Sequence, residues 1–225
     1  MRYTLAGLFL SVFFLPVCDA TETLTHEIDK QATARVPWEI GEIVGRNVDP
    51  ENNTFNIKFF GITSDGDYLV QEFYSYEGEK RTDPYLMTCP KPSEKNQTKD
   101  DEKFWKSCGI TGPLTGWHKN GKKQATGHYQ KGEQHGHWTT WHDNGQKMKE
   151  GYIQEGKAQG LWTYWHPNGQ KEQEGHYRNG KEQDTWIWWN ADGKKEQEGR
   201  FKNGEQKGLW IRWDENGKEL MRKKF

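Results

Sequence analysis

The sequence is poor in the aliphatic residues that usually fill a protein core. Mean hydropathy is −1.15 and 32% of the 225 residues are hydrophobic, a set that includes 12 Trp, 9 Tyr and 10 Phe. Aromatic side chains must therefore carry most of the burial. A strong charge of one sign is also missing, since 20 Lys and Arg stand against 15 Asp and Glu from Gly112 onward. That small surplus, without a recognisable nucleic-acid module, predicts no nucleic-acid partner.

Recognisable catalytic motifs are missing as well. The sequence has no nucleophile elbow, no phosphate-binding glycine loop and no zinc-protease motif. The carboxylate pair Glu172 and Glu174 recurs as Glu196 and Glu198. Such recurrence indicates a solvated strand face, because a catalytic constellation normally interrupts a repeat at one place. We therefore expect a non-enzymatic protein without a cofactor.

A long hydrophobic run occurs only at the N-terminus. Residues 1–20, MRYTLAGLFLSVFFLPVCDA, place one arginine before about a dozen mostly apolar residues and a small residue at Ala20. This pattern predicts a signal peptide cleaved after Ala20, since the run is too short to span a membrane. The protein is then exported, to the periplasm or the extracellular space. Alternatively, the stretch ending in Cys18 resembles a lipobox with a lipidated cysteine, although Val17 fits that motif poorly.

Cysteine is scarce, with three in the whole chain. Removing the signal peptide leaves Cys89 and Cys108, and an even count in an exported protein predicts a disulfide between them. The bond would close the charged segment 89–108, which otherwise has the composition of a loose linker. Before it, residues 21–88 contain strand-like stretches such as TFNIKFFGI, which predict a small β-rich region joined to the rest of the chain.

A 24-residue repeat without gaps fills residues 105–225. The first tryptophan of each copy recurs as Trp138, Trp162, Trp186 and Trp210, and the second as Trp117, Trp141, Trp165, Trp189 and Trp213. A glycine recurs as Gly127, Gly151, Gly175 and Gly199, and a bulky residue as Tyr129, Ile153, Tyr177, Phe201 and Phe225. Turn signals every dozen residues leave no room for helices. The prediction is an all-β fold, an elongated antiparallel meander of 24-residue β-hairpins.

Each repeat has two turns, represented by Asn168-Gly169 and Asn179-Gly180. Pro167 lacks the N–H that a two-residue hairpin would need at the first turn. Lys131 and Glu155 precede the glycine of the second turn and disfavour the positive φ that a two-residue turn requires. We therefore predict three-residue loops with a G1 bulge at both turns.

These loops set the predicted strand register. The expected pairs are Trp165 with Lys171, Leu161 with Gly175, and Tyr177 with Lys181. In this register the sheet slips by two residues per hairpin. Alternation then puts Leu161, Thr163, Trp165, Gly175 and Tyr177 on the better core face. The opposite face, which carries Trp162, Tyr164, Trp186, Trp188 and Trp210 among charged residues, is the predicted partner-binding face, because tryptophan and tyrosine are enriched at binding hot spots.

Histidines recur at one repeat position, as His118, His142 and His166. Equivalent positions lie two strands apart, nearly 10 Å, whereas the ligands of one zinc ion lie within a few ångström of each other. His135 and His137 share a strand face without other evident ligands. We therefore expect no metal site and solvated histidines.

The repeat resembles the MORN repeat in its bacterial variant form, over roughly residues 105–225. The match is carried by Gly160, Trp162, Trp165, Asn168, Gly169, Gly175, Tyr177 and Gly180. The resemblance implies an elongated meander that acts as a scaffold or binding module, with antitoxin-like or immunity-like bacterial members. Asp184 departs from the pattern by replacing a glycine, which predicts an irregular linkage there.

The sequence is compatible with three functions. The first is a protein-binding module of the cell envelope. One form of this function is an immunity protein that neutralises a toxin. The second is a glycan or cell-wall binder that stacks sugars on its tryptophan and tyrosine face. The third is a scaffold associated with anionic lipid, which rests on the basic excess and on the resemblance.

Overall fold

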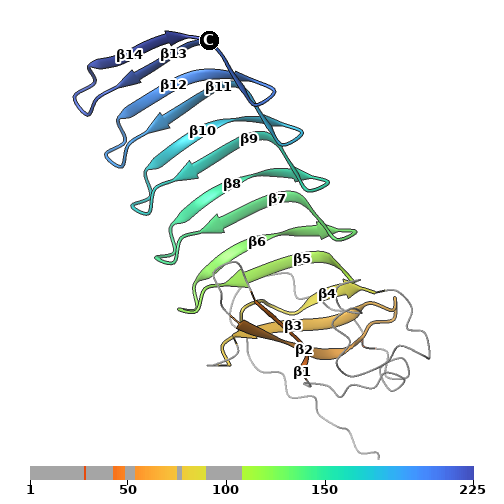
Figure 1. The fold of residues 1–225 in the computed structure, drawn as a ribbon. Coiled ribbons are helices and arrows are strands. Elements are labelled where there is room, and N and C mark those ends of the chain that lie inside the picture. The colour runs from red at the N-terminus through yellow and green to blue at the C-terminus, as the bar shows by residue number, and fades with distance from the viewer. Residues whose placement is uncertain (1–27, 29–42, 49–53, 75–77, 90–107) are drawn as a thin grey trace, which may run out of the picture.

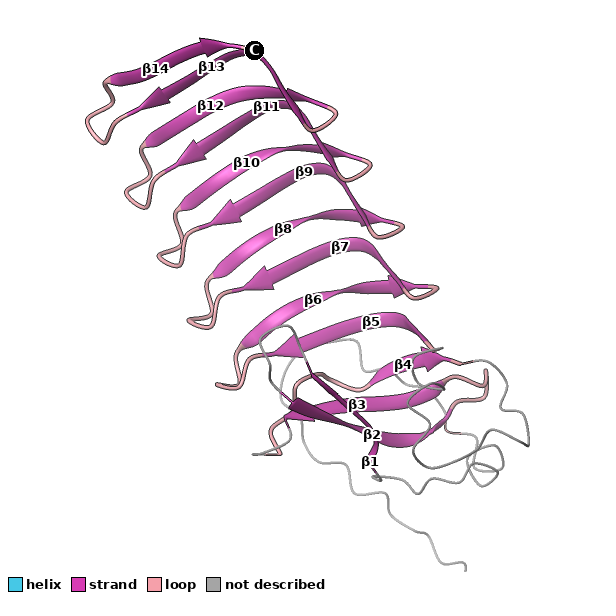
Figure 2. Cartoon of the chain, in the orientation of Figure 1, coloured by secondary structure: helices cyan, strands magenta, loops and turns pink. Residues whose placement is uncertain are grey.

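The computed structural model describes residues 28, 43–48, 54–74, 78–89 and 108–225. Over these residues the chain forms 14 strands in one antiparallel sheet, in sequence order and without a helix (Figures 1 and 2). The predicted signal peptide, with Ala20 and Cys18, lies outside them. The strands are β1 (Ile43–Val48), β2 (Thr54–Ile62), β3 (Tyr68–Tyr74), β4 (Tyr85–Thr88), β5 (Gly109–Trp117), β6 (Lys123–Gln130), β7 (Glu133–Trp141), β8 (Lys147–Gln154), β9 (Lys157–Trp165), β10 (Lys171–Arg178), β11 (Lys181–Trp189), β12 (Lys195–Lys202), β13 (Glu205–Trp213) and β14 (Glu219–Lys224).

The first four strands form a small unit with its own apolar core and continue directly into the repeats. Phe59 and Val70 are fully buried at its centre, and Ile110 and Leu114 of β5 pack against it. Pairing of β4 with β5 joins this unit to the array. The all-β meander with a β-rich N-terminal region is therefore confirmed.

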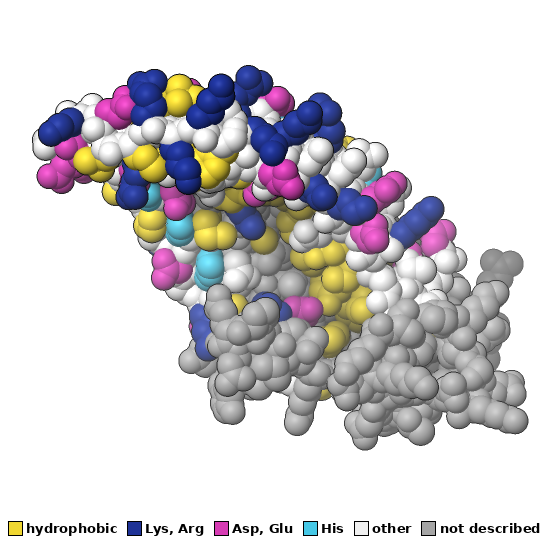
Figure 3. Space-filling view, turned by 45° about the horizontal axis from the view of Figure 1, so that its top comes forward, with side chains coloured by type: hydrophobic (Ala, Val, Ile, Leu, Met, Phe, Trp, Pro, Cys, Tyr) yellow, Lys and Arg dark blue, Asp and Glu magenta, His cyan; other side chains and the backbone are white. Residues whose placement is uncertain are grey.

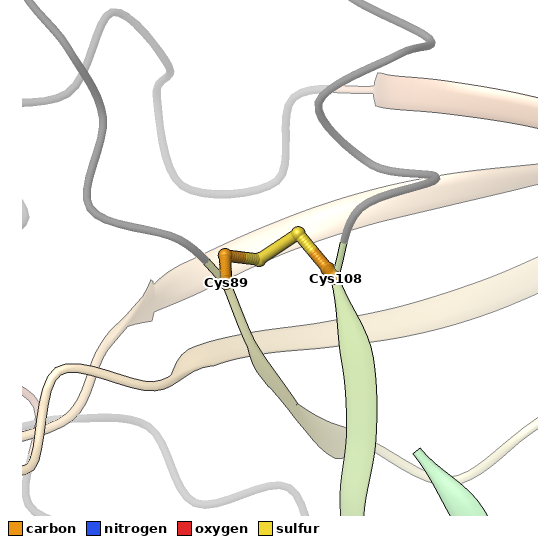
Figure 4. The surroundings of a disulfide bond; sticks show 2 residues. All are labelled: Cys89 and Cys108. Atoms are coloured by element: carbon orange, nitrogen blue, oxygen red, sulfur yellow. A yellow bond between two sulfur atoms is a disulfide. The ribbon is translucent and has the colours of Figure 1, made fainter. Parts of the chain in front are cut away.

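A disulfide joins Cys89 to Cys108 where β4 and β5 meet, with a Cα–Cα distance of 4.2 Å (Figure 4). Thr88 pairs with Gly109 immediately beside it. Both cysteines pack against the core of the first four strands. The predicted disulfide is present, and it fixes the junction between the N-terminal unit and the array.

The first turn of each repeat has the predicted three-residue loop. The Gly169 N–H donates to the His166 carbonyl at 2.9 Å, and the His166 N–H donates to the Gln170 carbonyl at 2.9 Å. Gly169 has a φ of 85°, which is the left-handed conformation of a G1 bulge. The proline at position 167 is the first corner residue of the turn, where its fixed φ is favourable.

The prediction for the second turn is wrong. Arg178 pairs directly with Lys181 around a two-residue turn in which both Asn179 and Gly180 have positive φ. In other repeats Lys131 and Glu155 adopt φ values of 53° and 49° at the first turn position. A non-glycine residue tolerates this region at some cost, and the stacked hairpins stabilise it. For example, the Gly180 N–H donates to the Ala158 carbonyl of the preceding hairpin at 2.9 Å.

The predicted register is correct for one pair only. Trp165 pairs with Lys171, but Glu172 is then the extra residue of a bulge, so Gly175 pairs with Trp162 instead of Leu161. Tyr177 likewise pairs with Glu182, not with Lys181. A one-residue bulge reverses the faces of all residues that follow it.

A second irregularity in each repeat removes the predicted slip. Thr163 pairs with Glu174, which pairs with Ile187, the residue 24 positions after Thr163. Asp184 has a φ of 59° at this irregularity, like Gly160 with 66° in the preceding repeat. The linkage at Asp184 is thus regular, and equivalent residues of successive repeats lie in direct register.

Solvated histidines were predicted at the first turns. Instead, these histidines link the turns to one another. His118, His142 and His166 place Nε2 at 2.8 to 3.0 Å from the tryptophan carbonyl at the corresponding place of the next repeat. Asn168 Nδ2 donates to the Ala191 carbonyl at 2.6 Å. Each turn is therefore tied to the next one along the array.

Candidate functional site

The first tryptophans of the repeats form a buried column along one face of the sheet, here called the tryptophan face. Trp138, Trp162, Trp186 and Trp210 are 2 to 6% exposed. Leu161, on the opposite face, is 49% exposed. The predicted assignment of faces is therefore wrong for Trp162, Trp186 and Trp210, because the bulge at Glu172 moves Gly175 and Tyr177 to the side of Trp162. Whether the face binds a partner stays a prediction.

Each tryptophan of the column lies over a glycine of the preceding strand. A Cβ atom added to Gly127, Gly151, Gly175 or Gly199 would lie less than 3.0 Å from the indole ring of Trp138, Trp162, Trp186 or Trp210, respectively. Cβ atoms in proteins essentially never lie so close to another heavy atom. The glycines of the repeat are thus seats for aromatic rings.

The bulky residues of the repeat pack edge-on against the same tryptophans. Tyr177 lies 5.0 Å from Trp186, and Phe201 lies 5.0 Å from Trp210, both in T-shaped geometry. Tyr164 and Trp188 extend the cluster, because their ring centroids lie 6.5 Å and 5.9 Å from that of Trp186. Such aromatic pairs add stabilisation beyond the area that they bury. A ribbon of rings therefore runs from one repeat to the next and takes the place of an aliphatic core.

Two hydroxyl groups lie close together beside these rings. The Tyr164 and Tyr177 hydroxyls lie 3.3 Å apart. Burial, followed by the hydrogen bond with Tyr177, raises the pKa of Tyr164 well above its ordinary value. Burial also raises the pKa of Tyr177. Partial burial disfavours the charged form of both groups.

Beside the buried column lies a row of residues in which the repeats differ. Consecutive cross-strand pairs build this variable row from Gly116, Ala125, Thr140, Lys149, Tyr164, Gln173, Trp188, Gln197, Arg212 and Met221. At the equivalent positions of β5, β7, β9, β11 and β13, the residue is Gly, Thr, Tyr, Trp and Arg in turn. Most members from Thr140 onward are half-buried. The row therefore changes from small to large side chains along the array.

On the opposite face, one set of contacts recurs from repeat to repeat, and the residues nearer the second turns are exposed. The second tryptophans lie there, and the Nζ atoms of Lys147 and Lys171 lie 5.5 Å and 5.8 Å from the ring centroids of Trp165 and Trp189. Lys171 also forms an ion pair with Glu174 at 2.6 Å. Tyr152, Leu161 and Leu209, nearer the second turns, are exposed. Trp165, a predicted core residue, is only half-buried.

One part of the surface of the array is hollowed. Figure 3 shows hydrophobic side chains gathered in a hollowed part of the surface, with Lys, Arg, Asp and Glu side chains along its rim.

Within the described residues, no group of three or more His, Cys, Asp or Glu side chains is placed to hold a metal ion. No helix of that part of the chain is long and apolar enough to span a membrane.

The predicted binding residues thus fall into two sets. Trp162, Trp186 and Trp210 are buried structural residues, whereas Tyr164 and Trp188 belong to the variable row. Sequence reasoning missed Lys149 and Arg212, the charged members of that row. A comparison of equivalent positions would have shown that they vary between repeats. Arg212 lies on the tryptophan face by simple alternation from Trp210 along β13, but the bulge that brings Lys149 to that face has no evident sequence signal.

Comparison with known families agrees with the fold. A family model described as "MORN repeat variant" matches residues 134–155 and 158–179, which hold the hairpins β7–β8 and β9–β10. The two matches support a MORN-repeat family, whose repeats are generally non-catalytic modules that bind proteins or lipids. No curated protein matches the chain.

Proposed function

We propose that this protein is an exported, non-enzymatic scaffold that binds an extended segment of a partner protein along the variable row of the tryptophan face. One observation carries the proposal: the repeats share their packed residues but differ at the row beside them. Exposed positions such as Leu161 vary freely because they pack against little. Variation at half-buried positions, where packing against a constant tryptophan would favour one residue, points to selection by a ligand.

The row has the composition of a binding surface. Tyr164, Trp188 and Arg212 are the residue types that most often dominate the free energy of protein association. They lie on a scaffold held by the buried tryptophans and the linked turns, so little conformational entropy is lost when a partner binds. The Trp188 indole N–H donates to Gln173 Oε1 at 2.6 Å, which fixes the orientation of that ring.

The length and charge of the row suit a short extended segment. Lys149 on β8 and Arg212 on β13 are five strands apart, about 24 Å at ~4.8 Å per strand. An extended chain covers this span with about seven residues. We expect the partner segment to carry acidic side chains near its two ends and apolar side chains over Tyr164 and Trp188.

The test compares binding by variants of the two faces in protein purified from its native host. Trp188→Ala and Lys149→Glu alter the row, and Leu161→Ser with Tyr152→Ala is the matched control on the opposite face. A partner retained by the wild type and the control, but lost from both row variants, supports the proposal. Equal retention by all variants, with melting temperatures showing that each is folded, refutes it.

Export is proposed from the disulfide together with the apolar N-terminus. Disulfides persist in oxidising compartments, and the Cys89–Cys108 bond closes the junction between the two parts of the sheet. A toxin is one class of partner suggested by the resemblance to immunity-like proteins. Sequencing the N-terminus of the mature protein tests export, because the expected first residue follows Ala20 and an intact Met1 contradicts it.

A further inference from the structure

The last strand departs from the repeat at the position that receives a tryptophan ring. The ring-seating glycines follow one another at intervals of 24 residues, as Gly127, Gly151, Gly175 and Gly199, and the next equivalent position is Lys223. The rest of the packing is kept, because Phe225 occupies the bulky position and lies 6.2 Å from Trp210 in T-shaped geometry. On the tryptophan face of β14, the exception is therefore confined to the position that receives the ring.

The substitution closes the seat by simple sterics. At each of the four glycines an added Cβ would lie less than 3.0 Å from the ring that covers it. Lys223 carries such a Cβ, and its Nζ lies 4.2 Å from the Phe225 ring centroid. A further strand could not place its tryptophan over β14 as β13 places Trp210 over β12.

A second departure affects the other contact between successive repeats. Lys147, Lys171 and Lys195 each lie over the second tryptophan of the following repeat, at 5.5 to 5.8 Å. The equivalent residue of β14 is Glu219, which binds Arg222 at 2.7 Å. A carboxylate is repelled by the negative face of an aromatic ring, so a following tryptophan would lose its cation–π contact.

These two changes coincide with an open sheet edge. β14 is the last strand of the sheet and pairs only with β13 among the described strands. Unprotected strand edges can pair with other chains, and lysine on the edge is one way of preventing this. At the other end of the array β5 is covered by β4 and the first apolar core, so it needs no such device.

We propose that β14 is a terminating strand: Lys223 and Glu219 close this edge of the array to a further tryptophan-bearing strand of the same kind. The proposal is independent of what binds the variable row. It predicts that removing the Cβ at position 223 creates a site for a tryptophan-bearing strand.

The experiment uses a fluorescent peptide with the sequence of β13, Glu205–Trp213, and the full chain. Lys223→Gly opens the seat, Lys223→Ala removes the charge but keeps the Cβ, and Lys224→Gly makes the same backbone change on the opposite face. We expect Lys223→Gly to bind the peptide at least about tenfold more tightly than the wild type and both controls. Replacing the peptide residue that corresponds to Trp210 by alanine should abolish the gain.

Each other result overturns the proposal. Equal binding by Lys223→Gly and Lys223→Ala would show that charge, not the Cβ, closes the edge. Equal binding by Lys223→Gly and Lys224→Gly would show a general backbone effect. Strong binding by the wild type would show that the edge is open.

Discussion

The contact between Gly175 and Trp186 predicts that a substitution at one of these positions changes the sign of the effect that a substitution at the other has on the free energy of unfolding. The Cβ of Gly175→Ala would lie less than 3.0 Å from the Trp186 ring, so the ring must move by more than about 0.5 Å to regain ordinary contact near ~3.5 Å. Trp186 is 2% exposed and is surrounded by other rings, so it has little room. We expect Gly175→Ala to lower the free energy of unfolding by about 3 kcal/mol, the upper part of the range for overpacking.

In a Trp186→Ala background the same substitution should become neutral or stabilising. Gly175 lacks the positive φ that would make alanine unfavourable. Replacing glycine by alanine at such a position stabilises a protein by ~0.4–1 kcal/mol, because the unfolded chain loses conformational freedom. Gly116→Ala is the matched control, because the nearest atom to its added Cβ lies at 3.7 Å; we expect it to change stability by less than about 1 kcal/mol.

The assay is urea unfolding of the four proteins of this double-mutant cycle, followed by tryptophan fluorescence and circular dichroism. The expected coupling energy between positions 175 and 186 is about 3 kcal/mol or more. If Gly175→Ala costs the same with and without Trp186, the ring does not lie over this glycine, and the explanation of the repeat glycines is wrong.

Three further predictions follow from burial, the disulfide and the tyrosine pair. Trp186→Ala should cost about 3–5 kcal/mol of stability and Leu161→Ala about 0.5 kcal/mol or less in thermal or urea melts, and the reverse order would contradict the assignment of faces. Cys89→Ala together with Cys108→Ala should cost about 3 kcal/mol, whereas two free thiols in the unreduced, unfolded mature protein would show that the bond is absent. Because burial raises the pKa of Tyr164 and Tyr177, the free energy of unfolding should be constant up to about pH 10 and fall above it, as the unfolded chain loses protons that the folded chain keeps. In urea titrations at several pH values, Tyr164→Phe should weaken that fall, whereas Tyr152→Phe, at an exposed site, should not. If the free energy of unfolding falls equally steeply with pH in the wild type and both variants, the tyrosine pair is not the cause of the fall.

Much of the fold was predictable because the repeat gives the same signal five times. The 24-residue period, the three-residue loop around Gly169 and the Cys89–Cys108 pair each follow from local chemistry, and each is present. The faces were not predictable, because they depend on the bulge at Glu172, which is an ordinary polar residue. Neither were the second turns, where Lys131 and Glu155 adopt a conformation that their own preferences oppose and that inter-repeat hydrogen bonds stabilise.

The candidate site was predictable only in part for the same reason. Tyr164 and Trp188 were chosen as exposed aromatic residues, and both lie in the variable row. Trp162 was chosen by the same rule and is buried, because burial in a single-layer sheet depends on which glycine faces the ring. One-residue shifts therefore decide which aromatic residues build the scaffold and which are available to a ligand.

The direct register of the repeats also bears on how such a chain can change over generations. Thr163, Glu174 and Ile187 lie side by side with no offset, so the junction after one hairpin is interchangeable with the junction after the next. A duplication or deletion of 24 residues anywhere between β6 and β13 would join two surfaces that already match. The length of the variable row could then grow or shrink in steps of about 9.6 Å, two strand spacings, without any compensating substitution in the neighbouring repeats.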